Sequence, residues 1–261
     1  MPKFSANLSM LFTERTFLDR FEAAAKAGFP GVEYVGPYDF PKEEVAARLK
    51  DYGLKQALFN LPAGDWAKGE RGIACHPDRV AEFRAGVALA IDYAHALDCP
   101  TINCLAGIRP TSVPVADAHR TLVDNLGYAA GELRREGILL IVEPINHFDI
   151  PGFFLNHSAE TLAVLDEAGS ANLKLQYDIY HMQRMEGELA ATMEKHLERI
   201  GHIQIAGNPG RNEPDTGEIN YPYLMRRLDE LGYAGWVGAE YKPKGRTEDG
   251  LDWFGAWGGK A

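Results

Sequence analysis

The stretch ILLIVEPINHFDIPGF, residues 138–153, begins with five apolar residues and changes character at Glu143. A continuous apolar run rich in Ile, Leu and Val is typical of a strand that is buried on both faces in a parallel sheet. The carboxylate cannot belong to the buried part of such a strand, and Pro144 directly afterwards favours the end of the strand. We therefore expect residues 138–143 to form a strand whose last residue, Glu143, lies at one edge of a sheet.

Similar apolar segments recur along the chain, and each is followed by a segment with helical periodicity. Eight repeats of strand and helix predict a closed parallel (β/α)₈ barrel, the TIM barrel. An open doubly wound sheet is the alternative, but the chain lacks the GxGxxG turn of nucleotide-binding sheets. Ser158 is expected to be the N-cap of one helix. The expected strands are residues 4–9, 31–35, 54–61, 101–107, 138–143, 173–178, 202–206 and 236–241, and the expected helices are residues 16–28, 41–53, 78–98, 116–136, 158–169, 187–200 and 221–232.

Length and composition fit one soluble barrel domain over residues 1–261, with 46% apolar and 25% charged residues. The formal net charge of −10 disfavours binding to nucleic acid or to an anionic membrane. Cys75, Cys99 and Cys104 follow no CxxC pattern, which suits a reducing compartment. No apolar run approaches the ~20 residues that cross a bilayer, so we expect a soluble protein, and the cysteine pattern favours the cytoplasm.

Four successive strands end in, or close to, a side chain with an oxygen donor. Glu143, Asp178 and Glu240 end the fifth, sixth and eighth expected strands, and Gln204 lies near the end of the seventh. In a TIM barrel these ends converge on one mouth, where the chemistry of such enzymes is located. Three unpaired carboxylates would repel one another there, and a divalent cation would neutralise them. The all-oxygen donor set favours Mg²⁺ or Mn²⁺.

Each of these residues also has a purely structural interpretation. Asp178 could cap a turn, Gln204 could bond to neighbouring backbone, and a strand-end carboxylate such as Glu33 could pair with a Lys or Arg. The coincidence of four oxygen donors on successive strands favours the metal site. Alternation along the sixth strand places Gln176 and Lys174 on the same face as Asp178, which requires either a polar barrel interior or a bulge.

Long blocks that cover nearly the whole chain carry a family resemblance. They include FSANLSMLF, NLPAGDWAKGERGIAC, VEPINHFDIPGFFL, QYDIYHMQRMEGEL, HIQIAGNPGRNEPDTGEINY and WVGAEYKP. In these blocks the chain resembles hydroxypyruvate isomerases of the xylose-isomerase-like barrel superfamily. The resemblance implies a metal-dependent isomerase of glyoxylate metabolism that interconverts hydroxypyruvate and tartronate semialdehyde through an enediolate. Its substrate is then a small anionic hydroxy-oxo acid, and family habit suggests a homo-oligomer.

The resemblance also assigns roles to residues at the mouth. Glu143, Asp178, Gln204 and Glu240 match the metal ligands of the family, and Glu143 and Glu240 match its acid/base pair. In the related ketose 3-epimerases the seventh-strand ligand is usually a histidine, whereas here it is Gln204.

The substrate carboxylate requires a cationic partner. His181 and Arg211 match positions that contact substrate oxygens in the superfamily, and a guanidinium can hold a carboxylate with two hydrogen bonds. Lys242 is a further candidate, and the alternative for each cation is a solvated loop charge. Trp66 lies in the long loop 62–77, where it could cover the site and exclude water or simply anchor the loop.

Other functions are compatible with the same barrel. An isomerase of a four-carbon 2-oxo acid, or a ketose isomerase or 3-epimerase acting on a longer sugar, would use the same proton transfer in a larger pocket. A sugar-acid binding protein that holds the metal without turnover is the non-enzyme alternative. An apurinic-site endonuclease would need several histidine ligands and a basic groove, and neither is visible in the sequence.

Overall fold

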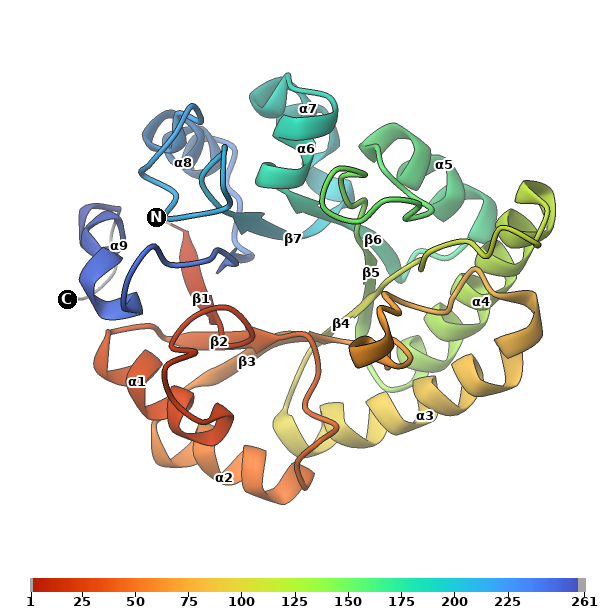
Figure 1. The fold of residues 1–261 in the computed structure, drawn as a ribbon, viewed down its shortest axis with the longest axis horizontal. Coiled ribbons are helices and arrows are strands. Elements are labelled where there is room, and N and C mark those ends of the chain that lie inside the picture. The colour runs from red at the N-terminus through yellow and green to blue at the C-terminus, as the bar shows by residue number, and fades with distance from the viewer. Residues whose placement is uncertain (1, 258–261) are drawn as a thin grey trace.

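The computed structural model describes residues 2–257 and shows parallel strands that close into a barrel (Figure 1). Strands adjacent in sequence are adjacent in space, and β1 pairs with β8 to complete the ring. The predicted TIM barrel is therefore confirmed, while residue 1 and residues 258–261 of the expected domain lie outside the described residues. Within residues 2–257 the strands are β1 Lys3–Asn7, β2 Gly31–Tyr34, β3 Lys55–Asn60, β4 Thr101–Cys104, β5 Leu139–Val142, β6 Leu173–Asp178, β7 Ile200–Ile205 and β8 Trp236–Ala239.

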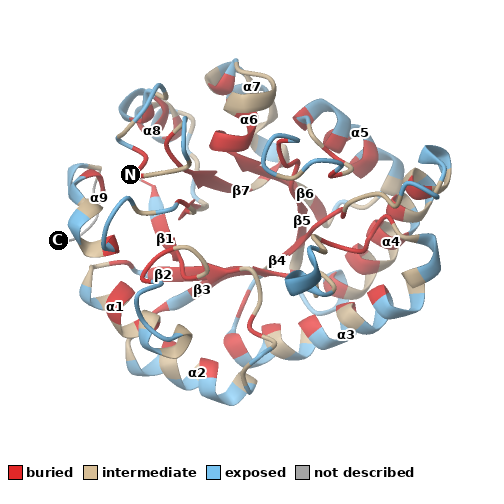
Figure 2. Cartoon of the chain, viewed as in Figure 1, coloured by how far each residue is buried: buried red, intermediate tan, exposed pale blue. Residues whose placement is uncertain are grey.

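Helices surround the barrel, with buried faces towards the strands and exposed faces outwards (Figure 2). The longest, α4, buries Leu122, Leu126, Ala129 and Leu133, which are spaced three and four residues apart and so form one apolar stripe. None of the helices described is long and apolar enough to span a membrane. The α-helices are α1 Arg20–Lys26, α2 Lys42–Asp51, α3 Val80–Leu97, α4 Val115–Arg135, α5 Ser158–Ala168, α6 Ile179–Met185, α7 Leu189–His196, α8 Tyr221–Glu230 and α9 Asp252–Ala256.

Several strands are shorter than the sequence predicts. β4, β5 and β8 end at Cys104, Val142 and Ala239, between one and three residues before the expected ends at 107, 143 and 241. Glu143 and Glu240 therefore follow their strands directly, at the start of the loops. This shift places both carboxylates at the mouth, and the backbone N–H of Glu240 still donates to Ile205 O of β7 at 3.2 Å.

The expected N-cap of α5 is wrong. His157 is the N-cap, and Ser158 is the first residue of the helix. Its backbone N–H and its hydroxyl both donate to the carboxylate of Glu186, at 3.0 and 2.7 Å. An acidic side chain from another segment thus accepts a hydrogen bond from a free backbone N–H group at the start of the helix, and the local sequence cannot reveal this role.

The short helices α6 and α9 were not expected from the sequence. α6 begins at the residue after β6 because the carboxylate of Asp178 caps it. Asp178 Oδ1 accepts hydrogen bonds from the backbone N–H groups of Tyr180, at 2.8 Å, and His181, at 3.3 Å. Asp178 therefore has the capping role that was considered as its structural alternative, while its second oxygen stays free for other contacts.

The barrel interior is polar near the mouth. Gln176 is buried, and its Nε2 donates to Gln204 Oε1 at 2.7 Å. The register between β6 and β7 also shifts between Leu175 and Gln176. Both explanations for the polar face of the sixth strand, a polar interior and a local irregularity, therefore apply.

A buried carboxylate lies at the centre of this polar interior. Glu33 accepts hydrogen bonds from Ser5 at 2.6 Å and from Gln204 at 2.7 Å, and its Oε2 lies 2.9 Å from His202 Nε2. The expected pairing with a Lys or Arg is wrong, because a histidine supplies the partner. Burial acts to raise the pKa of Glu33, but the ion pair with His202 and the hydrogen bonds outweigh it and lower the pKa. Gly238 makes room, since a Cβ there would lie 2.3 Å from the Glu33 carboxylate oxygens.

Candidate active site and metal centre

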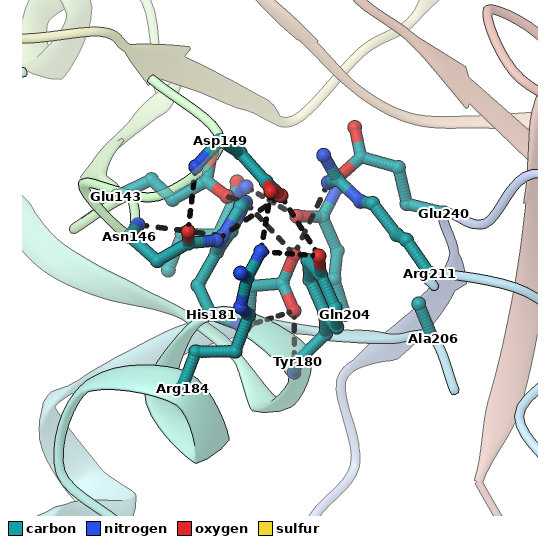
Figure 3. A network of polar contacts seen from close by, with 12 residues as sticks. Glu143, Asn146, Asp149, Tyr180, His181, Arg184, Gln204, Ala206, Arg211 and Glu240 are labelled. Atoms are coloured by element: carbon teal, nitrogen blue, oxygen red, sulfur yellow. Dashed lines mark hydrogen bonds and ion pairs between the residues drawn. The ribbon is translucent and has the colours of Figure 1, made fainter. Parts of the chain in front are cut away.

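Three carboxylates and one imidazole converge at the mouth of the barrel (Figure 3). Glu143, Asp178, His181 and Glu240 each offer one ligand atom, and these atoms lie within 4.8 Å of one another. They come from the ends of β5, β6 and β8 and from the first turn of α6. The structure therefore brings together three of the four predicted metal ligands, and it adds a histidine that sequence reasoning assigned to the substrate. The donor set is consistent with a divalent cation.

The electrostatics of the cluster favour a cation. Burial raises the pKa of Glu143 well above its usual value, and repulsion from Glu240 and Asp178 adds to this effect. Burial also raises the pKa of Asp178, and it raises that of Glu240 to about 7 although Arg211 counteracts part of the shift. The pKa of His181 is lowered well below 6.5, mainly by burial, so the imidazole is neutral. Carboxylates that are costly to ionise alone are stabilised by a bound metal ion.

Arg211 supplies the positive charge of the cluster. Its Nη2 forms an ion pair with Glu240 Oε2 and lies 3.5 Å from Asp178 Oδ2. The backbone of Arg211 has a φ of 56°, in the left-handed region that non-glycine residues rarely adopt. The backbone N–H of Lys242 holds it there by donating to Arg211 O at 2.6 Å. The loop after β7 is thus tied to the segment after β8, with the guanidinium aimed at the carboxylates.

Gln204 lies beside Asp178 in the sheet register. Its Oε1 accepts from Gln176 Nε2, and its Nε2 donates to Glu33 Oε1, each at 2.7 Å. The donation to Glu33 fixes the amide so that the oxygen is turned away from that carboxylate. An amide oxygen has two lone pairs, so the bond from Gln176 leaves one for a metal. The role of Gln204 as a ligand stays a prediction.

Two asparagines that sequence reasoning missed support the candidate acid/base pair. Asn103 Nδ2, from β4, lies 3.4 Å from Glu143 Oε2. Asn7 Nδ2, from β1, lies 3.1 Å from Glu240 Oε1. Both asparagines end or nearly end their strands, so the position of polar residues at strand ends would have identified them. Each glutamate thereby has one oxygen oriented by an amide from a neighbouring strand.

A second network of missed residues surrounds His181. Asn146 Nδ2 lies 2.5 Å from His181 Nδ1 and 3.2 Å from Asp149 Oδ2 (Figure 3). Asp149 also accepts from Tyr180 Oη at 2.9 Å and forms an ion pair with Arg184. The loop after β5 is thus bonded to α6 directly beside the cluster.

A family model described as xylose isomerase-like TIM barrel matches residues 21–257 of the chain. The chain belongs to this family. It is 58% identical to the hydroxypyruvate isomerase of Escherichia coli, over 97% of this chain and 98% of that protein. It is 48% identical to the 2-oxo-tetronate isomerase of Cupriavidus necator, with the same coverage. A crystal structure described as an AP endonuclease, family 2, from Brucella melitensis is 46% identical, covers 98% of this chain and 99% of its own, and superposes with a TM-score of 0.96. The resemblance to hydroxypyruvate isomerases is therefore confirmed.

In this xylose isomerase-like barrel, the two remaining candidates for substrate binding, Lys242 and Trp66, are exposed and are not part of the carboxylate cluster. Lys242 is exposed, and the contacts found for it are made by its backbone, to Arg211 and Asn212. Trp66 is 43% exposed and stacks under the guanidinium of Arg71, whose Cζ lies 4.0 Å from the ring centroid. The proposed contacts of Lys242 and Trp66 with substrate stay predictions.

The loop that carries Trp66 is anchored at its base. The backbone N–H of Gly72 donates to Ala63 O at 2.9 Å, which closes the loop. Gly72 has a φ of 108°, and a Cβ there would lie 2.3 Å from Leu105 O. Glu70 accepts from Arg79 at 2.6 Å at the start of α3. Residues 64–71 therefore project as one unit from a base fixed to the barrel.

Proposed function

We propose that the chain is an isomerase that interconverts hydroxypyruvate and tartronate semialdehyde. The observation that carries the proposal is the pair Glu143 and Glu240, which approach one buried cluster from opposite sides (Figure 3). Two carboxyl groups with raised pKa values suit the removal and the return of a proton near neutral pH. The 58% identity to a hydroxypyruvate isomerase supports this substrate.

The reaction moves one hydrogen between adjacent carbons. One carboxylate removes a proton from C3 of hydroxypyruvate, and the other carboxyl group returns a proton to C2. The hydroxyl on C3 loses its proton and becomes the aldehyde oxygen, while the carbonyl oxygen on C2 gains one and becomes a hydroxyl. Glu143 and Glu240 perform the two transfers at carbon. Asn103 and Asn7 orient one oxygen of each, and the second oxygen of Glu240 is paired with Arg211.

The cluster would hold Mg²⁺ or Mn²⁺ through Glu143, Asp178, Glu240 and Gln204. When bound, the cation would act as a Lewis acid that stabilises negative charge on the substrate oxygens. Arg211 lies at the same cluster, and its guanidinium carries enough donors to bind the carboxylate of the substrate. A small hydroxy-oxo acid would thereby be held at both ends.

A four-carbon 2-oxo acid is the second candidate substrate. The 48% identity to a 2-oxo-tetronate isomerase, over 97% of this chain, favours it. The proton transfer is the same, and the substrate is longer by one hydroxymethylene group. The loops after β3 and β5, residues 62–77 and 144–157, would set the length that is accepted.

Proton NMR in D₂O tests the proposal. The purified protein is incubated with hydroxypyruvate, with 2-oxo-tetronate and with D-fructose, each with and without EDTA. Appearance of tartronate semialdehyde with deuterium at carbon, lost on adding EDTA, would support the proposed isomerase. Exchange on one of the longer substrates alone would keep the proton transfer and overturn the substrate. No turnover and no deuterium exchange with any of the three substrates would favour a binding protein.

A further inference from the structure

We propose that Asn146 fixes the tautomer of His181, so that the imidazole donates a hydrogen bond to the substrate and does not bind the metal. The role towards the substrate rests on the proposed function. The tautomer itself follows from contacts within the protein, so it can be tested separately. Asn146 is a positioning residue in this account, since it acts through His181.

The orientation of the Asn146 side chain follows from two backbone groups. Asn146 Oδ1 accepts hydrogen bonds from the backbone N–H of Phe148 at 3.1 Å and of Asp149 at 2.9 Å. Backbone N–H groups only donate, so the atom that faces them must be the amide oxygen. The NH₂ group of Asn146 therefore lies on the opposite side, towards His181.

This NH₂ group determines which nitrogen of His181 carries hydrogen. Asn146 Nδ2 lies 2.5 Å from His181 Nδ1, and the backbone N–H of Asn146 points to the same atom at 3.4 Å. An amide nitrogen has no lone pair to offer, so Nδ1 must accept. A protonated Nδ1 would face two donors without an acceptor. The neutral ring consequently carries its hydrogen on Nε2.

Asp149 prevents the amide from turning over. Its Oδ2 accepts the second hydrogen of Asn146 Nδ2 at 3.2 Å. Asp149 is itself held by Tyr180 Oη at 2.9 Å and by the ion pair with Arg184. A flipped amide would lose all four contacts of its oxygen and nitrogen and would place two oxygens against each other. Asp149 thus accepts from Arg184, Tyr180 and Asn146, and the other hydrogen of the Asn146 amide is left for His181 Nδ1.

The Nε2–H of His181 faces the carboxylates of the cluster. Nε2 lies 3.7 Å from Glu143 Oε1 and 3.5 Å from Asp178 Oδ2, which is too far for strong hydrogen bonds. A nitrogen that carries hydrogen cannot offer a lone pair to a metal. His181 is thus set to donate to an oxygen of the substrate, and the metal is left to the oxygen ligands.

The NMR test uses ¹⁵N-labelled metal-free protein. Long-range ¹H–¹⁵N spectra of the imidazole distinguish a protonated from an unprotonated ring nitrogen, and the His181→Gln variant assigns the signals. We expect a protonated Nε2 and an unprotonated Nδ1 in the unmodified protein. A protonated Nδ1 would overturn the inference, whether or not the protein turns over hydroxypyruvate. Turnover by the unmodified protein tests the proposed function on its own.

Two variants of Asn146 test its role. Asn146→Asp keeps the oxygen that binds the backbone and replaces the donor by an acceptor, so the tautomer should invert. The double variant Asn146→Asp with Asp149→Asn should also invert the tautomer, and it keeps the number of charges unchanged.

In both Asp variants the lone pair freed on His181 Nε2 should tighten Mn²⁺ binding, measured by calorimetry. The value of kcat should fall about 100-fold, and KM should change less. Asn146→Ala removes the donor without adding an acceptor and should lower kcat without tightening Mn²⁺ binding. An unchanged tautomer in both Asp variants, or Mn²⁺ affinity that falls with kcat, would contradict the proposal.

Discussion

Arg211 forms an ion pair with Glu240 at the mouth of the barrel, although the two residues stand on loops that follow different strands. The guanidinium thereby offsets part of the negative charge of the carboxylate cluster. The same group is the proposed partner of the substrate carboxylate. A charge that serves both roles links metal binding to substrate binding.

Replacing Arg211 should separate these two roles. We expect Arg211→Gln to raise KM for hydroxypyruvate by a factor on the order of 100, because a bidentate charged hydrogen bond is lost. Mn²⁺ should bind at least as tightly as before, since a competing positive charge has gone. Steady-state kinetics and calorimetry with Mn²⁺ measure the two effects. The partly exposed Arg199, which pairs with Asp166 far from the mouth, is the control, and Arg199→Gln should change neither quantity. Weaker Mn²⁺ binding in Arg211→Gln would show that the guanidinium supports the metal site.

The acid/base pair is tested by amide substitutions of the same shape. Glu143→Gln and Glu240→Gln should each lower kcat by a factor on the order of 1,000 or more, because neither amide can accept the proton from carbon. Circular dichroism should show that the fold survives. Near-normal turnover in either variant would remove that glutamate from the mechanism.

Stability of the metal-free protein should fall as pH rises. The pKa values of Glu143 and Glu240 are raised in the folded state, that of Glu240 to about 7. Above the usual carboxyl pKa, the folded state therefore binds more protons than the unfolded state. These groups contribute their full stabilisation to the folded state below the usual carboxyl pKa, and this contribution is lost as the pH rises towards 7 and beyond. We expect the loss of Tm between about pH 5 and pH 8 in EDTA to be smaller in Glu143→Gln than in the unmodified protein. Equal losses in the two proteins would argue against a raised pKa of Glu143.

The buried ion pair of Glu33 and His202 should be important for stability. Glu33→Gln leaves the histidine without its charged partner in the barrel interior, which we expect to cost about 3 kcal/mol of unfolding free energy. Urea unfolding measures the change. The matched control is Asp92→Asn, which removes an exposed partner of Lys42 and should have no measurable effect. A loss for Glu33→Gln no larger than for the control would show that the network is not required for folding.

The features that were predictable share a local origin. Apolar strands and amphipathic helices alternate within short windows, and this rhythm is enough to predict the barrel. Carboxylates at strand ends are visible at single positions, so Glu143, Asp178 and Glu240 were identified before any geometry was known. The supporting amides were missed because the expected strands, 4–9 and 101–107, ran past Asn7 and Asn103, which in the structure lie at or next to the strand ends.

The TIM barrel and the strand-end positions of its three carboxylates were predictable from the amino-acid sequence, because each of these properties depends on residues close together in the chain. Which side chains meet follows from the three-dimensional fold. Closure of β1 on β8 brings Asn7 within 3.1 Å of Glu240, 233 positions away, and no local pattern encodes that contact. The direction of the bond between Asn146 and His181 likewise depends on atoms from the loop after β5 and from α6 within hydrogen-bond distance. Hydrogen bonds are short and directional, so they are fixed only once the barrel has closed.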